Sequence, residues 1–294
     1  MKFLYIVIFI STFLKVQAQS DTTDLLSLLG DEPTTEYTTA SFKTSRVVNG
    51  QSIENTAKGV MDIKINHRFG FFSGGSYELF GLDQAMIRLG IDYGITDRLM
   101  VGIGRNSYEK VVDGFLKYKI LRQSTGKRNM PISLSYAVDI DMKTINSSNP
   151  EVNKRFWLRA YYTNQLLIAR KLSAGTTLQL MPTLVHRNYV ATIAEKNDVY
   201  LMGIAARQKL SKRIAINLEY YYALPNQLTS DKTNSLAIGF DIETGGHVFQ
   251  VFFVNSNGTD HRSFLTETTG KWGNGDVRLG FNISRVFTIV KPRE

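Results

Sequence analysis

Residues 213–224 read RIAINLEYYYAL, and apolar side chains occupy every second position along this stretch. Ile216 and Leu218 fall on one face of an extended chain, whereas Asn217 and Glu219 fall on the other. Successive side chains of a β-strand point to opposite faces, so a period of two predicts a strand with one apolar and one polar face.

The same alternation recurs along the chain from about residue 58. It predicts twelve strands, near 59–70, 85–95, 99–108, 111–121, 130–141, 154–168, 176–187, 199–209, 213–224, 234–243, 247–255 and 277–287. Most of these segments exceed the five or six residues that are usual for strands of soluble proteins. They match the roughly 9 to 11 residues that a tilted strand needs to cross a bilayer.

The connections between the predicted strands alternate in length. Residues 96–98, 210–212 and 244–246 are short turns, whereas 142–153 and 256–276 are long loops. Short turns at one end and long loops at the other are typical of outer-membrane barrels. The sequence therefore predicts an all-β fold: an antiparallel up-and-down transmembrane β-barrel of about twelve strands over residues 58–290, with short periplasmic turns and longer extracellular loops.

The N-terminus has the pattern of a secretory signal peptide over residues 1–18. Lys2 supplies the positive charge, an apolar run follows, and Val16-Gln17-Ala18 forms a small-residue cleavage site. The alternative is a membrane anchor, but the apolar run of about 12 residues is shorter than the roughly 20 that a spanning helix needs. We therefore expect export by the general secretory route.

Residues 19–57 are predicted to be a periplasmic N-terminal segment that is acidic and partly disordered. Residues 19–42 contain five acids and no Lys or Arg, whereas 43–294 contain 33 bases and 21 acids. An acidic peptide with apolar side chains can dock on a basic surface, which leaves a spacer, a docking peptide and a plug as alternatives. The candidate partner-docking residues are Leu25, Leu26, Leu28 and Leu29.

Composition excludes several classes of site. The chain has no Cys, so disulfides, cysteine-ligated metals and thiol catalysis are excluded, and its four His leave little room for a His-based metal centre. The net charge is +9, but the bases are spread over lumen and rim positions, so nucleic-acid binding is not expected. No cofactor and no metal are expected. Only His261 and Ser263 have a spacing that could suggest a hydrolase pair.

The polar faces of the twelve strands are predicted to line the lumen. The candidate lumen-lining residues are Arg88, Asp92, Asp113, Lys117, Asp139, Arg155, Arg159, Arg187, Arg207, Glu219, Asp241 and Arg278. Because unpaired charges in a confined space of low dielectric constant are costly, opposite charges are expected to pair. Two interpretations remain: an interior closed by ion pairs, and a narrow pore that weakly selects anions.

Five stretches, taken together, resemble a known family. They are Ser52-Ile53-Glu54-Asn55, residues 77–85 (YELFGLDQA), 92–98 (DYGITDR), 113–119 (DGFLKYK) and 280–287 (GFNISRVF). The chain resembles, from about Thr35 to Phe287, an uncharacterised family of outer-membrane β-barrel proteins from Bacteroidota, a domain of unknown function. The resemblance implies a barrel in the outer membrane of a Gram-negative bacterium and carries no activity, substrate or catalytic residue.

The sequence thus favours a non-enzymatic outer-membrane barrel, either a narrow porin-like channel or a structural component of the envelope. The alternative is a receptor or accessory subunit that docks a periplasmic partner through its acidic N-terminal peptide. A lipid hydrolase of the outer membrane is a distant third. The expected partners are outer-membrane lipids and an envelope protein, and the sequence leaves the oligomeric state open.

Overall fold

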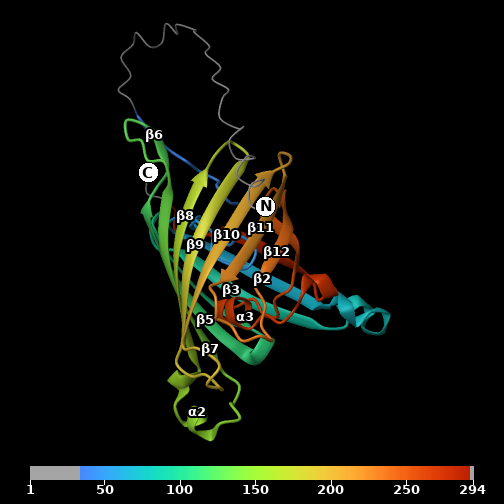
Figure 1. Cartoon of the computed structure of the whole chain (residues 1–294). Coiled ribbons are helices and arrows are strands. Elements are labelled where there is room, and N and C mark those ends of the chain that lie inside the picture. Colours follow the sequence, from blue (N-terminus) through green and yellow to red (C-terminus); the bar gives the residue numbers. More distant parts are fainter. Residues whose placement is uncertain (1–33, 292–294) are drawn as a thin grey trace, which may run out of the picture. The chain divides into compact units, whose positions relative to one another are not determined.

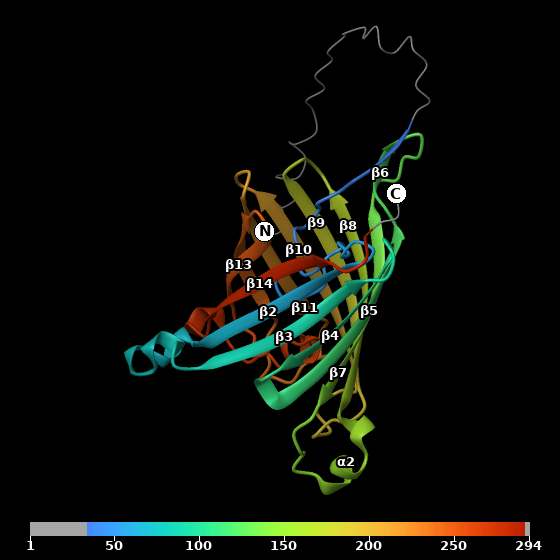
Figure 2. The same ribbon diagram turned by 180° about the vertical axis from the view of Figure 1, so that it is seen from behind.

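Twelve antiparallel strands close into a barrel in the computed structural model, which describes residues 34–291 (Figures 1 and 2). Around the barrel the strands follow the order β10-β11-β12-β13-β14-β2-β3-β4-β5-β7-β8-β9, so each strand pairs with its neighbours along the chain. The ring closes where β14 pairs with β2, with Ile283 opposite Ile65 and Asn282 opposite Asn66. The predicted twelve-stranded up-and-down barrel is therefore confirmed.

The barrel strands agree with the predicted segments to within a few residues, with one exception. They are β2 (Val60–Phe71), β3 (Ala85–Gly94), β4 (Leu99–Asn106), β5 (Val111–Leu121), β7 (Ser133–Lys143), β8 (Ala160–Lys171), β9 (Thr176–Arg187), β10 (Asp198–Lys209), β11 (Ile214–Ala223), β12 (Leu236–Thr244), β13 (His247–Val254) and β14 (Arg278–Thr288).

The exception is β8, whose predicted start at residue 154 was wrong. Asn149 caps a short helix, α2 (Pro150–Lys154), by accepting a hydrogen bond from the Glu151 N–H, and Pro150 occupies its first turn. A 3₁₀ turn, η5 (Phe156–Arg159), follows. Proline at the first helical position and an Asn cap both favour a helix start. The strand begins only at Ala160, which pairs with Met142.

The barrel is polar inside and apolar outside. On β2, Asp62, Lys64, Asn66 and Arg68 are all buried, whereas the intervening Ile63 points outward and is 37% exposed. Exposed apolar side chains repeat around the outer surface, among them Leu89, Ile103, Leu116, Tyr136, Leu180, Ile204, Leu218 and Phe240. A continuous apolar outer band with a polar interior is the arrangement of a barrel that faces lipid.

The two ends of the barrel differ. At the end with short turns, β6 (Ser124–Gly126) pairs with β1 (Thr35–Tyr37) in a separate two-stranded sheet. At the end with long loops lies α2, opposite β6 in both views (Figures 1 and 2). The same end carries the loop with α3 (His261–Thr266) and the turns η2 (Phe72–Gly74), η3 (Ser76–Gly81), η4 (Tyr108–Lys110) and η6 (Trp272–Asn274).

Among residues 34–291, no helix combines the length and the apolar character needed to cross a membrane. The expected signal peptide (1–18) and the docking candidates Leu25, Leu26, Leu28 and Leu29 lie outside the described residues.

The outer band predicts a depth-dependent response to charge on a single strand. Leu218 lies at the middle of β11 and Leu224 just beyond its loop end, and both side chains are exposed. We expect Leu218→Arg to lower the free energy of unfolding by about 2–4 kcal/mol and Leu224→Arg by about 0–1 kcal/mol. Reversible denaturant unfolding of the barrel from lipid vesicles measures both. Equal costs at the two positions would contradict a lipid-facing band.

Candidate functional site in the barrel lumen

The lumen is filled by the chain's own N-terminal part. Residues 41–56, here called the inner segment, follow β1 and are buried apart from Lys43, Glu54 and Asn55. Figure 2 shows this part of the chain, in blue, running from the β6 end into the barrel. We expected residues 19–57 to be periplasmic and partly disordered; the structure instead places 41–56 of that segment inside the barrel.

The inner segment is folded back on itself as a hairpin. The Val47 N–H donates to the Gly50 carbonyl at 2.9 Å, and the Ser52 N–H donates to the Ser45 carbonyl at 2.9 Å. Val48 and Asn49 are the central residues of the turn and neither has a positive φ; Gly50 follows at the fourth turn position, where glycine is common. The hairpin therefore satisfies part of its own backbone, and its tip is left to bond with the barrel wall.

A single carboxylate of the wall holds the tip. Glu219 of β11 accepts hydrogen bonds from three successive backbone N–H groups, those of Val48 (3.0 Å), Asn49 (3.1 Å) and Gly50 (3.0 Å). Consecutive N–H groups that converge on one anion form a strong, charge-assisted site. A Cβ atom at Gly50 would lie 2.0 Å from the Tyr221 hydroxyl oxygen, so only glycine fits beneath this tyrosine.

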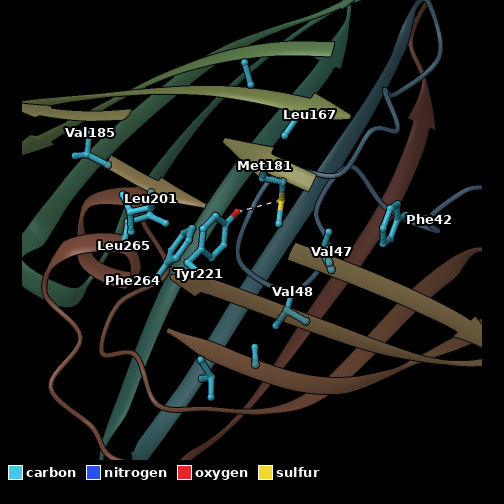
Figure 3. Packing of buried hydrophobic residues seen from close by; sticks show 14 of the residues in the cluster. Phe42, Val47, Val48, Leu167, Met181, Val185, Leu201, Tyr221, Phe264 and Leu265 are labelled. Carbon is cyan, nitrogen blue, oxygen red and sulfur yellow. Dashed lines mark hydrogen bonds between the residues drawn. The ribbon is translucent and has the colours of Figure 1, made fainter. Parts of the chain in front are cut away.

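Wall amides satisfy the carbonyls on the other side of the tip. Gln250 Nε2 donates to the Val47 carbonyl at 2.8 Å, and Asn282 Nδ2 donates to the Val48 carbonyl at 3.1 Å. The Val47 and Val48 side chains belong to a buried apolar cluster with Tyr221 (Figure 3). Buried backbone groups without a partner are costly, so this full pairing fixes the tip in place.

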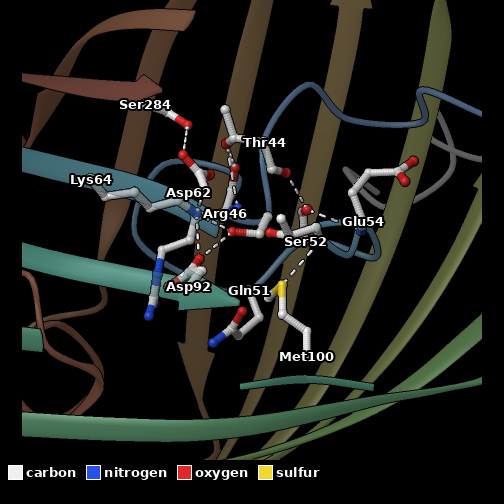
Figure 4. Close-up of polar contacts among 12 residues, drawn as sticks. Thr44, Arg46, Gln51, Ser52, Glu54, Asp62, Lys64, Asp92, Met100 and Ser284 are labelled. Carbon is white, nitrogen blue, oxygen red and sulfur yellow. Dashed lines mark hydrogen bonds and ion pairs between the residues drawn. The ribbon is translucent and has the colours of Figure 1, made fainter. Parts of the chain in front are cut away.

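Lysines bind the stem of the hairpin. Lys117 Nζ donates to the carbonyls of Ser52 (2.9 Å) and Glu54 (2.6 Å). Lys64 Nζ lies 2.6 Å from the Asp92 carboxylate, which also accepts a hydrogen bond from the Ser45 hydroxyl at 2.7 Å (Figure 4). The lumen charges thus bind both each other and the inner segment.

A second insertion enters from the long-loop end. Residues 255–268 carry α3, all six residues of which are buried. The Arg262 N–H donates to Asp141 at 2.9 Å, and the Arg262 guanidinium contacts Glu109, Asp260 and Glu267. Burial opposes ionisation of Glu109, but Arg262 and Lys143 outweigh it and lower the pKa of this carboxyl.

Two side chains of the barrel wall contact both the inner segment and the second insertion. Arg68 donates to the Asn49 side chain of the inner segment and to the Gly258 carbonyl of the second insertion. Asp139 accepts a hydrogen bond from Gln51 Nε2 at 3.1 Å and lies 3.2 Å from His261 Nδ1. Wall, inner segment and second insertion therefore form one connected polar network.

The structure places ten of the twelve candidate lumen residues on buried positions of the barrel strands. They are Arg88, Asp92, Asp113, Lys117, Asp139, Arg187, Arg207, Glu219, Asp241 and Arg278. Arg88 Nε donates to Asp113 at 2.8 Å, and Arg207 Nε lies 3.6 Å from Asp241. These neighbouring charges pair within the lumen.

Arg155 and Arg159 do not lie on the lumen wall. Arg155 is exposed at the end of α2, and Arg159 is half-buried in η5, because helical turns replace the predicted start of β8.

His261 and Ser263 engage different partners. His261 faces Asp139, whereas the Ser263 hydroxyl accepts a hydrogen bond from the Gly258 N–H at 2.7 Å. Both residues are 2% exposed or less, and among residues 34–291 no group of His, Asp or Glu is arranged to hold a metal ion. The inner segment was not predicted from the sequence, in which Asn49 and Gly50 are a general signal for a turn.

The carboxylate of Glu219 is predicted to keep the tip inaccessible. Because the chain has no Cys, Val48→Cys introduces a single thiol. We expect this thiol to resist a water-soluble thiol reagent in the otherwise unchanged protein and to react at least tenfold faster when Glu219→Gln removes the charged acceptor. Asp113→Asn is the matched control, since Asp113 pairs with Arg88 of the wall. Equal labelling rates in both double variants would show that Glu219 does not hold the tip.

The family assignment rests on a match of residues 42–287 to a membrane-bound β-barrel domain, DUF5777. No curated protein matches the chain.

Among solved structures, the NanC porin is 9% identical, covers 78% of this chain and 100% of its own, and gives a TM-score of 0.49. The outer membrane protein Omp33 of Acinetobacter baumannii is 7% identical over 81% of this chain and 100% of its own (TM-score 0.41). LpxR from Salmonella typhimurium is 11% identical over 78% and 100% (TM-score 0.37). Likenesses at this level carry no information on activity. The family match covers most of the chain, which therefore belongs to the DUF5777 family of membrane-bound β-barrel domains.

Proposed function

We propose that the protein is a non-enzymatic barrel of the outer membrane of a Gram-negative bacterium, and that it keeps its lumen closed with its own chain. In this proposal it is a structural or receptor-type component of the envelope rather than a constantly open porin. The membrane-bound family and the apolar outer band support the location. The resemblance to Bacteroidota barrels fits the same envelope.

The closed lumen rests chiefly on one observation: the Glu219 carboxylate binds three backbone N–H groups of the inner segment. The second insertion fills the long-loop side with buried α3. A solute that enters from either end meets a segment whose polar groups are bonded to the wall. Passage therefore requires these bonds to exchange, which makes a conducting state a separate conformation.

Hydrolase chemistry is not favoured by this arrangement. A nucleophile needs a base within hydrogen-bond reach and access for its substrate. Ser263 is bonded to the Gly258 N–H and His261 faces Asp139, and both lie inside a filled lumen. We therefore assign these side chains to the packing of the second insertion.

Planar-bilayer recordings test the closed lumen. We expect the full chain to give no steady current. A double variant lacks residues 34–57 and carries a short Gly-Ser linker in place of 257–269, and it is expected to give steady channels. A variant with only one of these two changes is expected to give a current between those of the full chain and the double variant. Removal of residues 19–33 alone is the control, since it leaves the inner segment in place, and should stay closed.

Folding of each variant is checked by the shift in gel mobility between heated and unheated samples. If the double variant does not fold, Glu219→Gln replaces it and is expected to raise the frequency of brief openings. A full chain that conducts as strongly as the double variant would contradict a lumen closed by its own chain.

A further inference from the structure

A cavity lies at the long-loop end, between the long loops and the end of the second insertion. It is a cavity of about 460 Å³, within the range of small-molecule sites. Four connections form it: β7 to β8, β9 to β10, β11 to β12, and the end of the second insertion.

Every acid of this lining already has a basic partner. Glu195 lies 3.1 Å from Arg187 and Asp231 lies 2.9 Å from Lys232. Glu267 pairs with Arg262, which packs over the Tyr161 ring. A cationic ligand would therefore have to compete with ion pairs that are already made.

Among the basic side chains of the lining, Arg159 differs in its pairing. Lys143 pairs with Glu109 at 2.9 Å, but within residues 34–291 Arg159 forms no ion pair. Its Nη1 donates to the Ile145 carbonyl at 3.2 Å, and its buried Nε–H has no hydrogen-bond partner among the described residues. An unpaired guanidinium with free donors favours a carboxylate or a phosphate.

One part of the lining is suited to an apolar body attached to that anion. Leu158, Leu228 and Val152 supply aliphatic surface, and Tyr161 and Tyr189 supply aromatic rings. Pockets of this kind hold a ligand by apolar contact and orient it with a few polar groups. A small inorganic ion would leave this surface uncovered.

We propose that this cavity binds a small organic anion, a carboxylate or phosphate ester with an apolar moiety, and that Arg159 binds its charged group. No residue of the inner segment lines the cavity, but Thr266 and Glu267 of the second insertion do, so binding is tested with that insertion intact. The same chemistry could come from a soluble solute or from the headgroup of an anionic lipid.

Calorimetric titration of the full chain with phenyl phosphate tests the proposal, with phenol and benzylamine as neutral and cationic counterparts. We expect saturable binding of phenyl phosphate only. Arg159→Gln should weaken it at least tenfold, as expected for loss of a charge-assisted contact. Arg105→Gln is the matched control, because Arg105 also donates to one backbone carbonyl, that of Lys110, but lies outside the cavity. It should change the affinity less than twofold.

A second variant separates the apolar wall from the charge. Leu228→Ala is expected to weaken binding of phenyl phosphate but not that of inorganic phosphate. Repeating the titration in nanodiscs distinguishes the sources of the anion: loss of binding only with anionic lipid assigns the cavity to a headgroup, and equal binding in neutral and anionic discs assigns it to a soluble ligand. Failure of phenyl phosphate to bind, or equal affinity in Arg159→Gln, would overturn the proposal.

Discussion

The contact between the Glu219 carboxylate and the tip of the inner segment determines what the rest of the lumen can be. A buried carboxylate without partners is unstable, and a chain entering a barrel brings backbone N–H groups that also need partners. At Glu219 the two requirements meet, since three successive N–H groups converge on one carboxylate. Gly50 makes the approach possible, because any larger side chain would collide with Tyr221. The position of the tip then decides which wall residues face the hairpin and which face each other.

The mixed charge of the lumen is explained by the same constraint. A water-filled pore could leave acids and bases solvated, but here they pair within the wall, as Arg88 does with Asp113, or bond the inserted chain, as Lys117 does with the Ser52 carbonyl. The wall residues Arg68 and Asp139 each contact both the inner segment and the second insertion, so the two segments are linked through the wall. Removing one member of a buried pair leaves the other charge buried without a partner. We therefore expect a substitution at one pair to weaken the neighbouring contacts of the network as well.

The wall of the barrel could be predicted from the sequence because each strand has a strict period of two and one lipid-facing side. Residues 213–224 are a clear case: the buried Asn217 and Glu219 alternate with the outward Ile216 and Leu218 as predicted. Arg155 and Arg159 show the limit of the pattern. Residues 154–159 fit the strand pattern, but the Asn149 cap and Pro150 start a helical turn instead.

The filling of the lumen could not be predicted in the same way. The period of a strand says which face is polar, but not whether water or another part of the chain meets that face. Asn49 and Gly50 are residue types that are common in turns, yet nothing local indicates that the partner of this turn is Glu219, 170 residues from Asn49. The burial of α3 could not be predicted for the same reason, because its residues lie in a loop whose length alone suggested an extracellular position. Contacts between distant segments thus decide the state of the lumen.

Amide hydrogen exchange at the tip tests the closed lumen most directly. In the full chain, reconstituted in lipid nanodiscs, the account predicts that the Val48, Asn49 and Gly50 amides exchange as slowly as those of the barrel strands, because each donates to the buried Glu219 carboxylate. Exchange of these three amides at the rate of an unstructured peptide, while the strands stay protected, would contradict it.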